Sequence, residues 1–234
     1  MKTKRLMGLS PRISMRLCLF LFTVLLLGLN NAHAAKLHFG LQANPELSWI
    51  KPNFTNASYD GLTFAYKYGL YAAYDITEHY AFATGVQISN RGGKYSYYDS
   101  LGIVATSYSI RQRIQYLDLP LNLKMTTNEI GYITYYGEFG LLPSIRLKAR
   151  FDEETFVNNV SQAKLENSNN LKDINPVSLA LHLGLGMQYS LTESTSFLVG
   201  AYFNNGFTDM LRDIKSMELK ANGNQVGLSV GILF

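Results

Sequence analysis

The strongest constraint on the fold is a strict alternation of residue types along residues 177–189. All seven odd-numbered positions there are apolar, from Val177 to Tyr189, whereas the even-numbered positions are small or polar and include Ser178, His182 and Gln188. Successive side chains of a β-strand point to opposite faces, so a period of two predicts a strand with one apolar face. Residues 225–234, which end at Phe234, repeat the pattern.

Eight such segments can be traced along the chain. They cover residues 37–43, 64–76, 80–89, 116–124, 131–142, 177–189, 196–204 and 225–234. The connections 75–79, 125–130 and 191–195 are short, whereas 48–63, 92–110, 144–175 and 205–224 are long and polar. Short turns at one end and long loops at the other are typical of bacterial outer-membrane barrels. The sequence therefore predicts an all-β fold, an eight-stranded antiparallel up-and-down transmembrane β-barrel with short periplasmic turns, long extracellular loops and periplasmic termini.

Residues 1–34 have the composition of a cleaved signal peptide. Five basic residues precede an apolar stretch from Leu17 to Leu29, and Ala32 and Ala34 are the small residues that signal peptidase requires. This stretch is shorter than the roughly 20 residues that a membrane-spanning helix needs. We expect cleavage after Ala34, with Ala35 as the alternative, which leaves a barrel domain at residues 35–234.

Removal of this segment changes the charge of the protein. It holds five of the 21 Lys and Arg residues and none of the 17 Asp and Glu residues, so the exported chain has a formal charge of about −1 and nucleic acid is not an expected partner. Cys18, the single cysteine, lies inside the apolar stretch, so we expect no lipid anchor there and no disulfide in the exported chain.

A soluble periplasmic lipocalin-like binding barrel would show the same alternation with its faces exchanged, and this alternative stays open. The membrane interpretation is favoured by the asymmetry of the loops, by the Gly and Ala on the small face, and by aromatic residues near the strand ends. Those expected near the periplasmic edge are Tyr74, Tyr80, Phe82, Tyr189 and Phe197, and those nearer the outer edge are Tyr66 and Tyr68.

The inward rows of the predicted barrel carry ionisable residues. They are His38, Lys67, Asp75, Arg91, Asp118, Lys124, Glu138 and His182. Because side chains fill the interior of an eight-stranded barrel, we expect the three Lys and Arg residues to pair with the three carboxylates and not to line an aqueous pore. A proton or ion pathway through these charges is the functional alternative.

The sequence predicts no catalytic, cofactor-binding or metal-binding residues. Nucleophilic catalysis needs a nucleophile with its base in reach, yet His38, His79 and His182 lie in no known nucleophile motif. Clustered metal ligands and phosphate-binding Gly-rich loops are not found either. A lipid-modifying outer-membrane enzyme remains an alternative of a different class.

Two groups of basic residues lie near the expected outer rim. Arg111 and Arg113 form one group, and Arg146, Lys148 and Arg150 form the other, at the start of the longest loop. Either group is suited to lipopolysaccharide phosphates, because the arginine guanidinium binds phosphate through two parallel hydrogen bonds. Ordinary solvated charge is the alternative. The following residues, 151–165, are compatible with a short helix, a strand extension or a flexible loop.

Three segments resemble the PorT-like outer-membrane β-barrel proteins of Gram-negative bacteria. Residues 116–124 read Tyr-Leu-Asp-Leu-Pro-Leu-Asn-Leu-Lys, residues 74–85 resemble the family's short turn between strands, and Gly92-Gly93-Lys94 follows. The resemblance spans most of residues 36–234 and implies an outer-membrane barrel, with an accessory role in protein secretion as one function. It assigns no catalytic residue. Pro120 cannot donate a hydrogen bond within a strand, so we expect a bulge beside it.

These observations together predict a non-enzymatic integral outer-membrane barrel that is structural or binds a partner through its extracellular loops. The expected partners are outer-membrane lipids including lipopolysaccharide, secretion-pathway proteins, and the barrel-assembly machinery, which would recognise the last strand through Phe234.

Overall fold

A computed structural model describes residues 37–52, 57–99, 106–157, 160–169, 171, 174–210 and 221–234. The predicted signal peptide lies outside these residues. The described chain forms eleven strands: β1 (Leu37–Pro52), β2 (Ala57–Tyr59), β3 (Thr63–Asp75), β4 (Tyr80–Asp99), β5 (Thr106–Asp118), β6 (Leu121–Thr126), β7 (Ile133–Val157), β8 (Val160–Asn169), β9 (Val177–Ser190), β10 (Ser196–Gly206) and β11 (Ala221–Leu233). In this part of the chain, no helix has the length and apolar character needed to cross a membrane.

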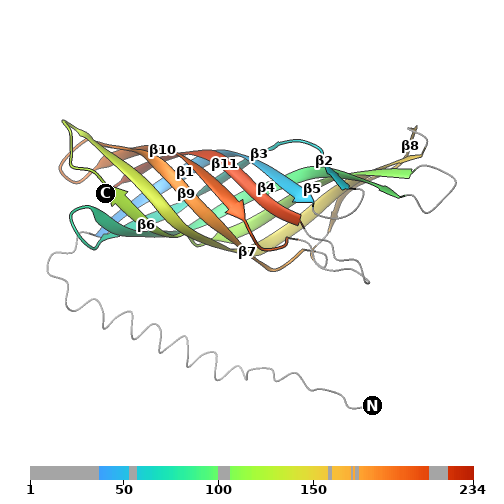
Figure 1. Ribbon diagram of the computed structural model, residues 1–234, viewed down its shortest axis with the longest axis horizontal. Coiled ribbons are helices and arrows are strands. Elements are labelled where there is room, and N and C mark those ends of the chain that lie inside the picture. The colour runs from blue at the N-terminus through green and yellow to red at the C-terminus, as the bar shows by residue number, and fades with distance from the viewer. Residues whose placement is uncertain are drawn as a thin grey trace, which may run out of the picture. The chain divides into compact units, whose positions relative to one another are not determined.

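All of the strands belong to one antiparallel sheet that closes on itself (Figure 1). The hydrogen-bonded path runs from β4 through β3, β1, β11, β10 and β9 to β7. Both β5 and β6 pair with β7 on one side and with β4 on the other, which returns the path to its start. The predicted all-β antiparallel fold is therefore confirmed, although the structure divides it into eleven strands and not eight.

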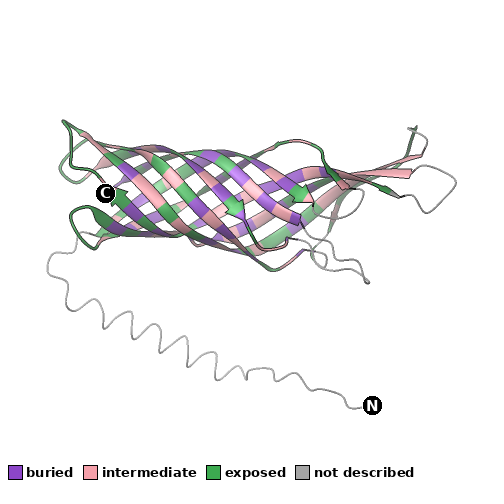
Figure 2. Ribbon diagram, in the orientation of Figure 1, coloured by how far each residue is buried: buried purple, intermediate pink, exposed green. Residues whose placement is uncertain are grey.

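The predicted apolar rows of the closed part of the sheet point outward, as the membrane interpretation required. Leu185 is 70% exposed although it lies in the middle of β9, whereas His182, in the alternate row of the same strand, is buried. Figure 2 shows this alternation as successive buried and exposed bands along the strands. The seven aromatic residues assigned to the two edges are all exposed on this face. The lipocalin-like alternative required the apolar rows to point inward and is therefore wrong.

Several strands are longer than the sequence predicted, because the loops at one end continue the sheet. β4, β5, β7 and β8 run beyond the closed part of the sheet, and β2 pairs with β4 there (Figure 1). We call this part, formed by residues 94–99, 106–112, 150–157 and 160–169, the sheet extension. Of the three alternatives for residues 151–165, the structure of the described residues 151–157 and 160–165 agrees with the strand extension.

The bulge expected beside Pro120 is not present. β5 ends at Asp118 and β6 begins at Leu121, but the register against β4 and β7 is the same on both sides of the gap. Leu119 donates its N–H to the carbonyl of Pro143 at 2.9 Å, and Pro143 has no N–H to return. Pro120 lacks the next donor, which would point to β4, because successive N–H groups of a strand point to opposite sides. The gap between β5 and β6 is therefore two missing hydrogen bonds, not a displacement of the chain.

Glycines on the inner face provide space for large inward side chains. A Cβ atom on Gly227 would lie 2.6 Å from the Tyr202 hydroxyl, and one on Gly200 would lie 2.5 Å from the Tyr136 hydroxyl. The small residues of the inner face thus leave room for tyrosine side chains that come from other strands of the wall.

Candidate functional site

The first group of interior charges joins β1, β3 and β10. Lys67 Nζ lies 3.8 Å from Glu46 Oε2, and both side chains are almost completely buried. The Tyr202 hydroxyl donates a hydrogen bond of 2.7 Å to the same carboxylate oxygen, and the Lys67 ammonium lies 4.2 Å from the centre of the Tyr202 ring. The buried Oε2 atom of Glu46 is therefore balanced by a cation and a hydroxyl donor, which offsets part of the cost of burying its charge.

Glu46 is a residue that sequence reasoning missed. The strand was predicted over residues 37–43 only, so it was expected to end before Glu46. In the structure β1 continues, and Asn44 and Pro45 simply lack pairing partners on β11. The alternation that places His38 on the inner face also places position 46 there when it is continued along the chain. This pattern could have identified Glu46 as an inward carboxylate.

A second ion pair lies on β4 and β5. Arg91 Nη2 is 3.5 Å from Asp118 Oδ1, and Asp118 is completely buried. Arg91 also donates to Gln225 Oε1 on β11 at 3.3 Å and lies over the ring of Tyr116 at 4.2 Å. The predicted pairing of inward charges is therefore observed for Arg91 and Asp118. The partners of Arg91 come from the neighbouring strand β5 and from β11.

Glu138 on β7 is the centre of a third group. It accepts hydrogen bonds from the Tyr71 hydroxyl at 2.8 Å and from Asn122 Nδ2 at 3.1 Å. His182 Nε2 lies 3.6 Å from the same carboxylate, while Nδ1 of that ring is 2.7 Å from Asn204 Oδ1. A cavity of only about 30 Å³ remains between these side chains, which is room for about one or two water molecules.

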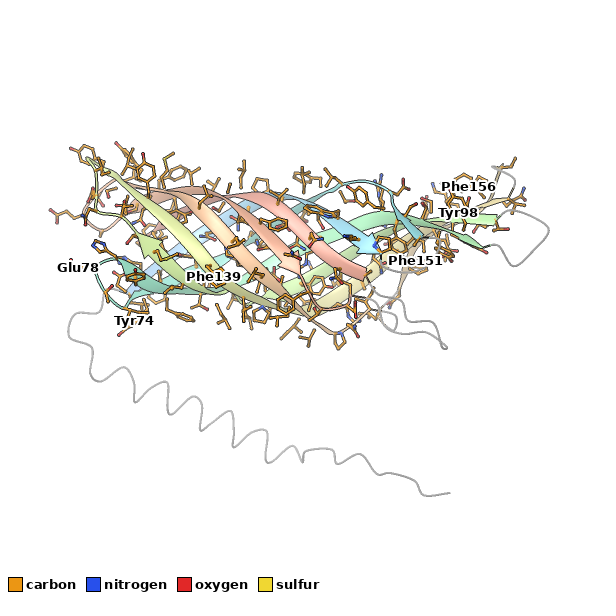
Figure 3. All side chains as sticks on the ribbon, viewed as in Figure 1. Tyr74, Glu78, Tyr98, Phe139, Phe151 and Phe156 are labelled. Carbon is orange, nitrogen blue, oxygen red and sulfur yellow. The ribbon has the colours of Figure 1, made fainter. Side chains whose placement is uncertain are left out.

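A wider polar cavity opens at the end that carries the short turns. It measures about 300 Å³ and includes His38, Asp75, Glu78, Lys124 and Glu129 in its lining. Glu78 and Tyr74 mark this end in Figure 3. His38 Nε2 lies 3.1 Å from Asp75 Oδ2, so the carboxylate of Asp75 is not the partner of a lysine. Lys124 instead donates to Gln188 Oε1 at 3.2 Å.

Apolar side chains fill the opposite end of the interior. Ile174 follows β8 and Met210 follows β10, and both are buried against inward residues of the wall, including Ile50, Ile114 and Tyr116. The two connections are joined, because Asn175 N–H donates to the Met210 carbonyl and Met210 N–H donates to the Ala221 carbonyl, each at 2.8 Å. We call this group the apolar plug. It separates the interior charges from the end that carries the sheet extension.

Among the described interior residues, neither His38 nor His182 is hydrogen-bonded to a Ser, Thr or Cys side chain that could act as a nucleophile. His182 contacts Asn204 and Glu138, and none of its hydrogen-bond partners among the described residues is Ser, Thr or Cys. His79 lies in the exposed turn between β3 and β4. The described residues also contain no group of three or more His, Cys, Asp and Glu side chains placed to hold a metal ion.

The structure does not keep the two predicted basic groups as the sequence spacing suggested. One member of the second group points inward, and the other residues of both groups lie together on the outside. The register between β5 and β7 shifts between Gln115 and Tyr116, because Leu147 is an extra residue on β7. Arg146 therefore points inward and donates to the carbonyl of Ile174. The remaining members share one outer surface, because Arg113 lies opposite Arg150 and Gln115 lies opposite Lys148.

A closed antiparallel sheet with an apolar outer face and an interior filled by polar side chains defines a membrane-embedded β-barrel. The chain matches a family model described as "Outer membrane protein beta-barrel domain" over residues 18–212. The protein therefore belongs to this family of outer-membrane β-barrel proteins. The narrower resemblance to PorT-like proteins stays a prediction.

Several solved structures are similar to this chain at low sequence identity. Neisserial surface protein A (NspA) is 13% identical, with a TM-score of 0.42 over 84% of this chain and 95% of its own. OprG from Pseudomonas aeruginosa is 12% identical, with a TM-score of 0.44 over 87% and 98%. Ail of Yersinia pestis, in complex with the heparin analogue sucrose octasulfate, is 14% identical, with a TM-score of 0.38 over 85% and 99%. A comparison with curated proteins gave no match.

Proposed function

We propose that this outer-membrane protein is a closed, non-enzymatic barrel that binds a partner through its sheet extension. The observation that carries the proposal is the contrast between the two parts of the sheet. The interior is filled by paired charges and by the apolar plug, so it offers no wide path for solutes. The sheet extension, in contrast, is regular, exposed structure beyond the closed wall.

Eight membrane-spanning strands form the wall in this proposal. β5 and β6 count as one strand, because their register against β4 and β7 is continuous across residues 119–120. β2 and β8 pair only with the extending parts of β4 and β7. The other seven strands are β1, β3, β4, β7, β9, β10 and β11.

The turns that follow β3, β6 and β9 face the periplasm in this proposal, together with both ends of the barrel domain. They are short, as are the periplasmic turns of bacterial outer-membrane barrels. The sheet extension then reaches out from the cell surface. A surface position supports partner binding, because exposed strands can bind another chain along their edge or across their face.

Crosslinking in living cells tests the proposal. A photoreactive amino acid at Tyr98, which is 60% exposed in the sheet extension, should give a crosslinked product of discrete size. The matched control is Phe139, which is 50% exposed in the middle of the wall (Figure 3) and should not give this product. A partner from the secretion machinery would support the accessory role. No discrete product at Tyr98 or at a second extension position, Phe156, would contradict partner binding.

Heat-modifiability and surface proteolysis test the barrel and its orientation separately. The folded protein should migrate faster on gels when it is not boiled, and protease added to intact cells should cut within residues 150–169. If the protease cuts there only after the outer membrane is opened, the sheet extension faces the periplasm and the proposed orientation is wrong.

A further inference from the structure

Five basic side chains gather on the outer surface of β4, β5 and β7, directly beyond the apolar rows. The register aligns outward residues of the three strands in rows, and Ile88, Leu117 and Ile145 form the last apolar row. The next rows are Asn90, Gln115 and Lys148, then Gly92, Arg113 and Arg150, and then Lys94, Arg111 and Asp152. We call Lys94, Arg111, Arg113, Lys148 and Arg150 the basic patch. The three strands lie side by side in Figure 1.

Two cross-strand pairs in the basic patch have like charge. Lys94 lies directly opposite Arg111, and Arg113 lies directly opposite Arg150. Opposed residues of an antiparallel pair have Cβ atoms about 4.5–5.5 Å apart, and like charges at that distance destabilise a sheet. Two such pairs in adjacent rows are unfavourable for the protein alone, so they favour an anion supplied from outside.

The protein itself neutralises only part of this charge. Arg113 Nη2 lies 2.7 Å from Asp152 Oδ1. Arg150 donates to the neutral Asn167 Oδ1 at 2.9 Å. Within the described residues, Lys94, Arg111 and Lys148 form no ion pair. Because the partner of Arg150 is neutral, Arg150 also has no counter-charge among these residues, and four of the five cations of the basic patch are therefore available to an external anion.

The position of the basic patch indicates what kind of anion it would bind. A ligand seated here lies next to the apolar surface of Ile145 and Leu147, which are 45% and 43% exposed. An amphipathic molecule with a phosphate head and acyl chains satisfies both surfaces at once. Guanidinium groups bind phosphate through two parallel hydrogen bonds, which suits Arg111 and Arg150.

We propose that the basic patch binds the phosphate groups of lipid A in the outer leaflet of the outer membrane. This inference rests on the proposed function, because the proposed orientation brings the patch to the outer leaflet. It also joins Arg111 and Arg113 to Lys148 and Arg150 in one site, to which β4 adds Lys94.

The test uses the purified protein, refolded in neutral detergent and titrated with bisphosphorylated lipid A. The melting midpoint is measured from the heat-modifiable gel band. It should rise with lipid A in the unaltered protein, and R111Q/R150Q should bind lipid A roughly tenfold more weakly or worse, because charge-assisted hydrogen bonds are lost. Without lipid A, the same variant should be at least as stable as the unaltered protein, because two like-charge contacts are removed. A defect in folding would lower stability under both conditions, so these opposite effects separate the two explanations.

The control variant is K51Q. Lys51 is an exposed cation on β1, and its cross-strand partner is the neutral Asn222. K51Q should leave lipid A binding within roughly twofold of the unaltered protein. An equal loss in K51Q and R111Q/R150Q would overturn the proposal, because the attraction would then depend only on net charge.

Three further ligands distinguish the source of the phosphate. Dephosphorylated lipid A, phosphatidylglycerol micelles and inorganic phosphate should each raise the midpoint less than bisphosphorylated lipid A does. An equal effect of any one of them would overturn the assignment to lipid A phosphates. If the protein is heat-modifiable but its melting midpoint does not depend on lipid A phosphate, this inference is wrong and the barrel structure is still supported. If no folded band is found at all, the proposed function itself fails.

Discussion

Phe39 and Phe234 exchange both of their backbone hydrogen bonds. Phe39 N–H donates to the Phe234 carbonyl at 3.1 Å, and Phe234 N–H donates to the Phe39 carbonyl at 2.7 Å. Phe234 thus continues the pairing between β1 and β11, while its ring stays 57% exposed. The backbone of Phe234 contributes to closure of the barrel, and its ring is available to another protein.

Deletion of Phe234 should impair assembly in cells more than it impairs stability in detergent. The loss of two hydrogen bonds should lower the free energy of unfolding by only about 1–3 kcal/mol. The amount of heat-modifiable protein in isolated outer membranes should fall much further if the assembly machinery recognises the ring. F234Y, which keeps the backbone and an aromatic ring, is the matched control and should assemble normally. Normal assembly of the deletion variant would count against recognition of the last residue.

The substitution Glu46→Gln should strongly destabilise the barrel. It leaves the Lys67 ammonium buried without a counter-charge, which should cost about 3–5 kcal/mol. Urea unfolding in detergent, followed by tryptophan fluorescence, measures the change. The control is Glu166→Gln, because the Lys164–Glu166 pair has the shorter distance of 2.7 Å but both side chains are more than half exposed. Its effect should stay within about 0.5 kcal/mol, and equal effects of the two substitutions would contradict the burial argument.

The substitution Gly227→Ala should destabilise the barrel, whereas Gly137→Ala should not. A Cβ atom on Gly227 would lie 2.6 Å from the Tyr202 hydroxyl and 2.8 Å from Glu46 Cβ, so the ring must move. We expect a loss of about 1–3 kcal/mol from overpacking. The nearest atom to a Cβ on Gly137 is 3.9 Å away, and that variant should unfold like the unaltered protein. The reverse order in urea unfolding would show that the inner face is packed differently.

Liposomes that contain the protein should not swell in isotonic solutions of small sugars. The apolar plug and the paired charges leave the interior without a wide aqueous path. A general porin in the same liposomes gives the positive control. Swelling at a rate that scales with the amount of protein would show that the interior opens in a membrane, and would revive the pore interpretation.

The wall of the barrel could be predicted because its residues follow a simple alternation. The row from Val177 to Tyr189 specifies which face is apolar without any knowledge of its neighbours, and the structure confirms it. The extent of the strands was harder to predict. Pro45 and Pro120 each lack a backbone donor, so each resembles the end of a strand, yet the pairing on either side is strong enough to continue past them.

The interior and the surface site depend on relations between strands that one sequence does not show. The pairing of Lys67 with Glu46 requires the register between β1 and β3. The basic patch was harder still to foresee, because a single extra residue, Leu147, separates the inward-pointing Arg146 from Lys148 and Arg150, which it brings to the outside. Lys94 belongs to the patch only because β4 extends into a segment that was expected to be a loop.

The gap at Leu119 and Pro120 lacks two hydrogen bonds of the wall, but it cannot tolerate a change in chain length. The register is in phase on its two sides, so the buried Asp118 precedes it and the buried Asn122 and Lys124 follow it on the same inner face. One inserted residue there would turn the following half-strand over and expose a lysine to lipid. During evolution, insertions and deletions in this chain should therefore accumulate in the long connections and avoid the position where the sheet itself is interrupted.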